Sequence, residues 1–150
     1  MEKLVEKRCY CCGNTKPIRE FNKNKSKQSG HCDECKECKK LLDLTYRRSE
    51  VGLITSIYST QKHISKKRGH TPPTYSKTQL TTFMYIHNYK ELYTAWEESG
   101  YIHNLVPSID RINRKLGYSL DNIQLVTWEF NNQKGREENR ETYSKRVQQY

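Results

Sequence analysis

Two Cys-x-x-Cys pairs lie near the N-terminus, Cys9 with Cys12 and Cys35 with Cys38, and 22 residues separate the pairs. The short span of each pair lets two thiolates reach one tetrahedral ion, and two such pairs at this separation are typical of a zinc site. Only 33% of the residues are hydrophobic, so the core is expected to be thin and to need a metal for folding. Four thiolates leave no open coordination position, so the predicted Zn²⁺ is structural.

Three further residues compete for ligand positions in this segment. Cys32 forms an alternative pair with Cys35, Cys11 is surplus, and His31 is a substitute ligand. We favour Cys38 over Cys32 because Cys38 leads into a predicted helix, whose N-terminal N–H groups stabilise thiolates.

The same segment resembles a zinc-ribbon module common in phage and bacterial nucleases. The shared pattern is C-x-x-C-G-x-x-K-P…F…G…C-K-x-C, and Pro17, Phe21 and Gly30 match it. The resemblance implies a small zinc-stabilised module that precedes a nuclease domain.

A second pattern lies between Pro107 and Gly135. The residues predict a strand at 108–112, a polar turn at 113–122, a second strand at 123–127 and a helix from Trp128 onward. Asp110 falls on the first strand and Asn131 in the first turn of the helix. A carboxylate and an amide oxygen are ligands that Mg²⁺ or Mn²⁺ accepts, with water and a phosphate completing the shell.

This stretch resembles the HNH, or ββα-metal, nucleases, most closely a phage-borne branch that reads S-I-D-R-I…G-Y…D-N. Asp110 matches the metal-binding Asp, Asn122 the middle Asn and Asn131 the helix ligand, nine residues after Asn122. Lys134 and Gly135 match a common N-x-x-K-G ending. The likeness extends upstream over residues 92–101. It implies a catalytic set of Asp110, Arg111, Asn122 and Asn131, with Asn122 orienting a neighbouring group.

Arg111 departs from the family pattern, because it stands where these nucleases carry the histidine that acts as general base. A guanidinium stays protonated and does not take a proton from water, although it can clamp a phosphate. The base must then come from elsewhere, and the alternatives are His103, Tyr118 and a second metal-bound water.

Positive charge is concentrated in the first half of the chain. The formal net charge is +10, and residues 1–70 hold 17 of the 27 Lys and Arg residues. Residues 36–70 read as helical, with a second helix beginning near Glu50. The predicted phosphate contacts are Lys62, Lys66, Lys67, Arg68, Arg111 and Lys134. We interpret His63 and His70 as polar surface groups.

The predicted fold class is α+β, in three parts. Residues 1–40 form the zinc ribbon, residues 41–73 a basic helical linker that ends at the stiff Thr71–Thr74 segment, and residues 74–150 the ββα-metal domain. Residues 75–101 are expected to form two helices whose aromatic side chains pack on the hairpin.

These features predict a divalent-metal-dependent endonuclease that acts on double-stranded DNA. No apolar run is long enough for a membrane span and no leader is expected, so the predicted location is the cytoplasm, that of a bacterial host if the chain is phage-encoded. The alternatives are a DNA-binding accessory protein that retained the scaffold without the base, and a protein-interaction module.

Overall fold

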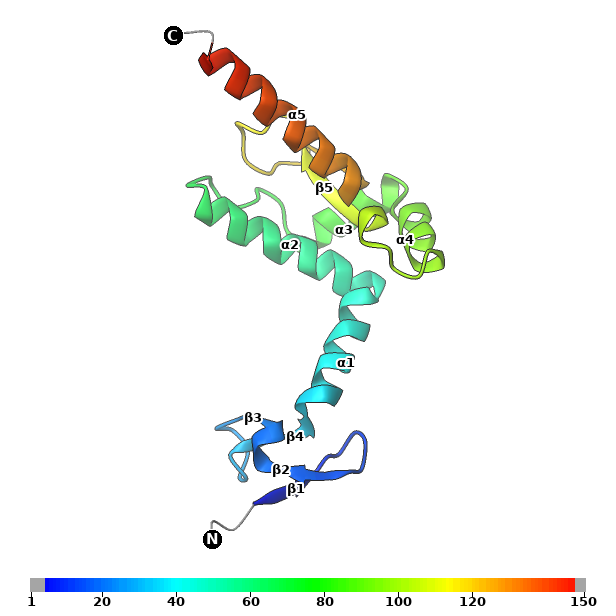
Figure 1. The fold of residues 1–150 in the computed structure, drawn as a ribbon. Helices are drawn as coiled ribbons and strands as arrows, with labels where there is room; N and C mark the ends of the chain where they lie inside the picture. The colour runs from blue at the N-terminus through cyan, green and yellow to red at the C-terminus, as the bar shows by residue number, and fades with distance from the viewer. Residues whose placement is uncertain (1–4, 148–150) are drawn as a thin grey trace. The chain divides into compact units, whose positions relative to one another are not determined.

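The computed structural model describes residues 5–147, with the side chains of residues 142–143 and 145–147 left aside. The chain divides into two compact units, residues 1–49 and residues 50–150 (Figure 1). Helices and small two-stranded antiparallel sheets are combined, so the fold is α+β, as predicted. In chain order the elements are β1 (Glu6–Arg8), β2 (Thr15–Pro17), η1 (Ile18–Glu20), β3 (Phe21–Lys23), β4 (His31–Cys35), α1 (Lys36–Arg48), α2 (Glu50–Lys67), α3 (Lys77–Ile86), α4 (Tyr89–Glu98), η2 (His103–Leu105), β5 (Pro107–Arg111), β6 (Ile123–Thr127) and α5 (Trp128–Val147).

The first unit has very little apolar core. Strands β1 and β2 pair as one hairpin, and β3 and β4 pair as another. Cys9, Phe21 and Cys35 are its buried apolar side chains, with Cys38 packed against them. A core this small supplies little hydrophobic stabilisation, so this unit depends on its cysteines.

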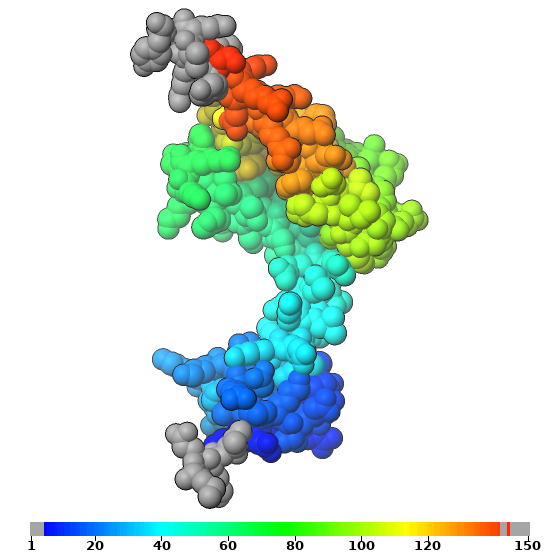
Figure 2. All heavy atoms as spheres, viewed as in Figure 1, coloured from blue at the N-terminus to red at the C-terminus, as the bar shows by residue number. Residues whose placement is uncertain are grey.

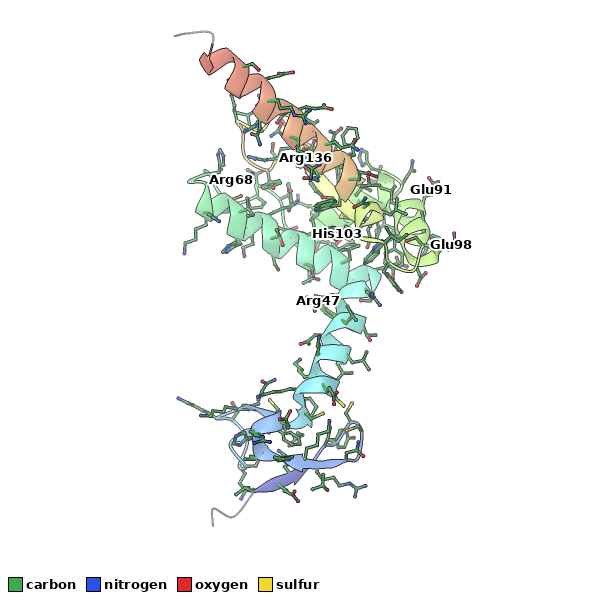
Figure 3. The ribbon with its side chains drawn as sticks, in the orientation of Figure 1. Arg47, Arg68, Glu91, Glu98, His103 and Arg136 are labelled. Atoms are coloured by element: carbon green, nitrogen blue, oxygen red, sulfur yellow. The ribbon has the colours of Figure 1, made fainter. Side chains whose placement is uncertain are left out.

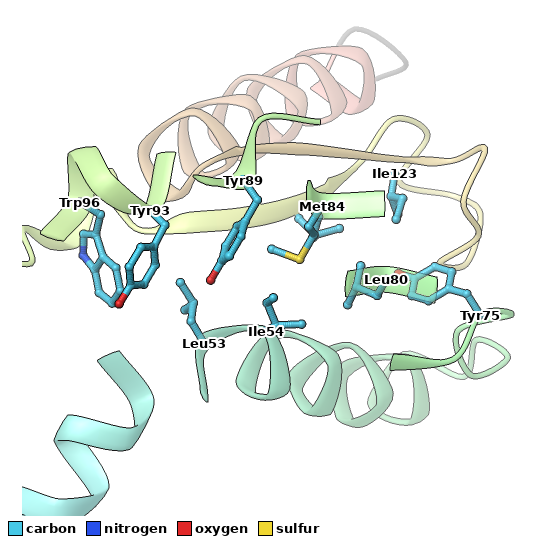
Figure 4. Close-up of a cluster of buried hydrophobic side chains, with 10 residues drawn as sticks. Leu53, Ile54, Tyr75, Leu80, Met84, Tyr89, Tyr93, Trp96 and Ile123 are labelled. Carbon is cyan, nitrogen blue, oxygen red and sulfur yellow. The ribbon is translucent and has the colours of Figure 1, made fainter. Parts of the chain in front are cut away.

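The second unit is built around a larger apolar core. Helices α2, α3 and α4 and the β5–β6 hairpin all contribute to it (Figure 4). Its buried members are Leu53, Ile54, Tyr75, Leu80, Met84, Tyr89, Tyr93, Trp96, Ile109 and Ile123. The aromatic residues of α4 are therefore core residues, as expected.

Local sequence signals explain how these helices begin and end. Ser76 and Gln79 form a capping box at the start of α3, in which each side chain accepts a hydrogen bond from the other residue's backbone N–H. Gly100 follows α4 with a φ of +75°, a left-handed conformation that glycine adopts without strain.

The predicted linker at residues 41–73 is divided between the two units. Residues up to Ser49 belong to the first unit, and α2 belongs to the second. The reason is that Leu53 and Ile54 on α2 are buried in the second unit's core. The basic end of α2 is thus an integral part of the unit that contains the ββα pattern.

The β5–β6 hairpin and α5 form the strand, strand and helix order that the sequence predicted. In the hairpin register Asp110 pairs with Gln124 and Arg111 with Ile123. Helix α5 packs against both strands, and Figure 2 shows its atoms lying along the second unit. Among the described residues no helix combines the length and the apolar character needed to cross a membrane.

Candidate functional site

The four predicted cysteines converge in the first unit. The sulfur atoms of Cys9, Cys12, Cys35 and Cys38 all lie within 4.8 Å of one another. Cys9 and Cys12 flank the turn between β1 and β2, Cys35 ends β4, and Cys38 lies in the first turn of α1. Sulfur atoms that share a tetrahedral zinc at about 2.3 Å are spaced about 3.8 Å apart, so this cluster can hold a metal ion such as zinc.

Local geometry shapes each half of this cluster. The turn after Cys9 closes through a 3.0 Å hydrogen bond from Gly13 N to Cys9 O, with Gly13 at a φ of +73°. The turn is tied to β4 through a bond from Tyr10 N to Asp33 O. Residues three apart on a strand point to opposite faces, which separates Cys32 from Cys35.

The competing ligands lie outside the cluster. Within the described residues, the cluster that could hold a metal ion contains neither Cys11 nor Cys32. His31 is also outside this cluster. Its Nδ1 lies 3.1 Å from the carbonyl oxygen of Ser29. The cluster therefore includes Cys38, the preferred residue, and leaves Cys32 out.

Electrostatics in the cluster favour a bound cation. Backbone N–H groups, that of Cys12 foremost, lower the pKa of Cys9 to about 6. One of these donors is Cys35 N, 3.2 Å from Cys9 Sγ. The neighbouring Cys35 sulfur raises the pKa of Cys38. Crowded thiolates oppose further ionisation, and a divalent cation removes that cost.

A polar cleft of about 430 Å³ lies in the second unit. We call it the Asp110 cleft. Three parts of the chain line it: the end of α2 with the residue that follows Gly69, the β5–β6 hairpin with its loop, and one face of α5. Its polar lining residues are Arg68, His70, Asp110, Arg111, Arg114, Tyr118, Asn131, Lys134, Glu138 and Asn139.

Asp110 is buried, and one of its two carboxylate oxygens accepts two hydrogen bonds. Oδ2 accepts a hydrogen bond from Gln124 Nε2 at 2.8 Å and from Lys134 Nζ at 2.6 Å. Lys134 also donates to the backbone carbonyls of Arg111 and Ile112. Lys134, which the sequence predicted to contact DNA, thus makes its described contacts inside the cleft, where β5 leads into the hairpin loop.

Asn131 lies in the same cleft and has an oxygen to offer. Its Nδ2 donates to Ser108 Oγ at 3.1 Å and to the carbonyl of Ile109 at 3.4 Å. Those bonds orient the amide, so that Oδ1 remains as an acceptor. A carboxylate oxygen and an amide oxygen on β5 and α5 fit a hard divalent cation, although Lys134 competes for the carboxylate.

Arg111 is buried beneath the hairpin loop. Its Nη1 donates to the carbonyl of Leu116 at 2.8 Å, and its guanidinium lies 5.2 Å from the ring centroid of Tyr118. Burial, together with the positive charges of Arg68 and Arg114, lowers the pKa of Arg111. The cleft therefore holds guanidinium groups close enough to repel one another, a situation that an anion relieves.

Asn122 forms hydrogen bonds with the backbone of the hairpin loop. Its Oδ1 accepts from Asn113 N at 2.9 Å, while its Nδ2 donates to the carbonyls of Asn113 and Gly117. The side chain is buried and is not among the residues that line the cleft. Its contacts show that it closes the loop between β5 and β6.

The other predicted residues separate into two groups. Arg68 lines the cleft from the end of α2 (Figure 3). Lys62, Lys66 and Lys67 are exposed on α2 outside the cleft lining. His103 packs against Trp128 with the rings tilted by 53° and their centroids 4.3 Å apart, and it is likewise absent from the lining. Tyr118, by contrast, is part of the lining.

Sequence reasoning missed His70 as a site residue. It lies 40 positions before Asp110 in the chain, and it follows a basic run that suggested a solvent-exposed helix end. The structure places it half-buried in the Asp110 cleft. The one available signal was Gly69, which marks the end of a helix and a change of chain direction.

Comparison with known protein families, characterised proteins and solved structures finds no match to this chain. Function is therefore inferred from the chain's own residues and their geometry.

Proposed function

We propose that this protein is a divalent-metal-dependent DNA endonuclease whose chemistry takes place in the Asp110 cleft. The observation that carries the proposal is the composition of that cleft. It gathers a carboxylate, an amide oxygen and several guanidinium groups around one hairpin and one helix. The resemblance of the same residues to the HNH pattern supports the proposed endonuclease function.

Asp110 and Asn131 are the residues that would hold the catalytic ion, Mg²⁺ or Mn²⁺. When bound, such an ion neutralises charge on the scissile phosphate and on the leaving oxygen. The Asp110 hydrogen bonds described above both end on Oδ2, which leaves Oδ1 as the ligand atom for such an ion.

Charge in the cleft suits a phosphodiester. Arg68, Arg111, Arg114 and Lys134 supply four cations, against the carboxylates of Asp110 and Glu138. Two of the cations are already paired, Lys134 with Asp110 and Arg114 with Glu138. Arg68 and Arg111 are then the groups best suited to bind phosphate oxygens.

The cysteine cluster has a structural role in this proposal. Four protein ligands close the coordination sphere of Zn²⁺, so the ion folds the first unit and takes no part in hydrolysis. The exposed lysines of α2, Lys62, Lys66 and Lys67, would add phosphate contacts that hold duplex DNA without reading its sequence.

Nicking of DNA with Mg²⁺ and with Mn²⁺ tests the proposal. Supercoiled plasmid and mixed-sequence genomic DNA serve as substrates for the wild type, for Asp110→Asn and for Asp121→Asn. Asp121 is an exposed carboxylate outside the cleft lining, so its variant is the matched control. We expect cleavage by the wild type and Asp121→Asn, and none by Asp110→Asn, with DNA affinity retained in all three. Absence of metal-dependent cleavage by the wild type would overturn the proposal.

A second candidate is a DNA-binding protein without hydrolytic activity. The pairing of Lys134 with Asp110 favours it, because an ammonium group already compensates the carboxylate charge that a metal ion would neutralise. Saturable, salt-sensitive DNA binding without cleavage by the wild type would support this candidate.

A further inference from the structure

We propose that His70 is the general base of this enzyme and replaces, from a different part of the chain, the histidine that the ββα pattern lacks at Arg111. The inference rests on the proposed nuclease function and names the residue that activates water. Its starting observation is that His70 lines the Asp110 cleft together with Asp110, Arg111 and Asn131.

The backbone of His70 is held in place by the way α2 ends. Gly69 has a φ of +69°, its N–H donates to the carbonyl of Lys66, and His70 N donates to the carbonyl of Ser65 at 2.9 Å. This pair of bonds is a Schellman motif, which turns the chain sharply after the helix. The turn directs His70 away from the helix axis at a defined point.

The segment after His70 is fixed to the hairpin loop. Thr74 N donates to the carbonyl of Tyr118 at 3.0 Å. Gly117 also lies against Thr71, since a Cβ added at Gly117 would be 3.4 Å from Thr71 Oγ1. His70 is therefore held between two anchored points, the end of α2 and the loop that closes β5 to β6.

Among the residues that the structure describes, none holds the imidazole of His70 by a hydrogen bond, an ion pair or a ring contact. The hydrogen bond described for this residue is made by its backbone, and its side chain is half-buried. Imidazole takes up a proton at neutral pH, which guanidinium does not. The ring of His103, by contrast, packs against Trp128 outside the cleft.

The charged and titratable groups around the cleft suit this role. Arg68 comes from α2, Asp110 and Arg111 from β5, Arg114 and Tyr118 from the loop, and Lys134 and Glu138 from α5. The positive charges among them outnumber the carboxylates, which suits the binding of an anionic phosphodiester beside His70.

The step balances as a hydrolysis. A water oxygen forms a bond to phosphorus while its proton passes to a ring nitrogen of His70. The bond from phosphorus to the 3′ oxygen breaks, and that oxygen takes a proton from solvent water. His70 then returns its proton to solvent, which leaves a 5′-phosphate and a 3′-hydroxyl.

The test compares His70→Ala with His63→Ala, which removes an exposed imidazole on α2 outside the cleft lining. Both are assayed with Mg²⁺ and Mn²⁺ on plasmid and mixed-sequence DNA, beside the wild type and Asp110→Asn. We expect His70→Ala to cleave 10²- to 10⁴-fold more slowly with unchanged DNA affinity, and His63→Ala to match the wild type. Added imidazole should restore part of the His70→Ala activity.

The pH profile provides a second readout. Wild-type cleavage should rise with pH across the range in which imidazole loses its proton, and His70→Ala should lose that rise. Equal cleavage by His70→Ala and wild type would overturn the role of His70 while leaving the nuclease function intact. Loss of activity that imidazole does not rescue, together with a lowered melting temperature, would also overturn it, because His70 would then be structural. No cleavage by the wild type would overturn both proposals.

Discussion

Lys134 Nζ lies 2.6 Å from Asp110 Oδ2 and joins α5 to the end of β5. The same ammonium group donates to the carbonyls of Arg111 and Ile112, so three acceptors of one strand end converge on it. This contact stabilises the hairpin–helix unit, and it would compete with a cation that binds Asp110. Its two effects can be separated by substitution.

Lys134→Met should therefore have opposite effects on stability and on metal binding. Loss of a mostly buried ion pair and two backbone hydrogen bonds should lower the free energy of unfolding by about 1–3 kcal/mol. Removal of the competing charge should strengthen Mn²⁺ binding. Urea denaturation and Mn²⁺ titration followed by electron paramagnetic resonance check the two effects. Lys115→Met, at an exposed position, is the control; weaker Mn²⁺ binding in Lys134→Met would contradict the competition.

Zinc removal should unfold the first unit and spare the second. The second unit's core contains no cysteine, whereas three of the four ligands belong to or pack on the small core of the first. Chelation, or Cys35→Ser, should abolish amide protection in residues 5–49 and leave it in residues 50–147, as hydrogen exchange can measure. Cys32→Ser should retain one zinc per chain by elemental analysis. Retained zinc in Cys35→Ser would refute the ligand set.

Asn122→Ala should destabilise the second unit by about 2–4 kcal/mol, because a buried side chain with three hydrogen bonds to the loop is lost. Chemical denaturation measures this loss. Asn104→Ala, at an exposed position, should change stability little. A neutral result for Asn122→Ala would show that the loop is closed by other contacts.

Glu50 should make the second unit sensitive to acid. Lys90 and then Tyr85 donate hydrogen bonds to its carboxylate and lower its pKa below the ordinary value of 4.5. A carboxyl whose pKa is lowered by folding stabilises the protein above the unfolded pKa, and that stabilisation is lost as pH falls through the folded pKa. The free energy of unfolding of the wild type should exceed that of Glu50→Gln by about 0.5–1 kcal/mol at pH 7. This difference should shrink as the pH falls below 4.5.

Thermal or urea unfolding between pH 2.5 and pH 7 measures that difference. Glu98→Gln, which removes an exposed carboxylate on α4, serves as the control and should show no such trend. A constant difference between wild type and Glu50→Gln at every pH would rule out the ionised carboxylate as its cause.

Lys67→Glu should weaken DNA binding and flatten its salt dependence. Each phosphate contact contributes about −0.9 to the slope of log affinity against log salt concentration, so one lost contact should reduce the slope by about that amount. Fluorescence anisotropy at several salt concentrations measures it. Lys77→Glu changes the same charge at the exposed start of α3. Equal effects of the two variants would indicate a general charge effect in place of a contact by α2.

Local patterns in the sequence determined much of the secondary structure and the cysteine set. The strand at 123–127 and the start of α5 at Trp128 were predicted with the bounds that the structure has. The start of α2 at Glu50 was predicted as well. The four clustered cysteines could be predicted from their spacing alone. Two cysteines three positions apart can bind one ion whatever the rest of the fold is.

Tertiary structure alone decided which side chains meet. His70 and Asp110 come from segments 40 residues apart, and they share a cleft because α2 packs its Leu53 and Ile54 into the core beneath the hairpin. Lys134 meets Asp110 because α5 folds back along β5. Contacts of this kind depend on how whole helices and strands pack and on the side-chain rotamers that result. The hydrophobic periodicity of the sequence specifies neither of these.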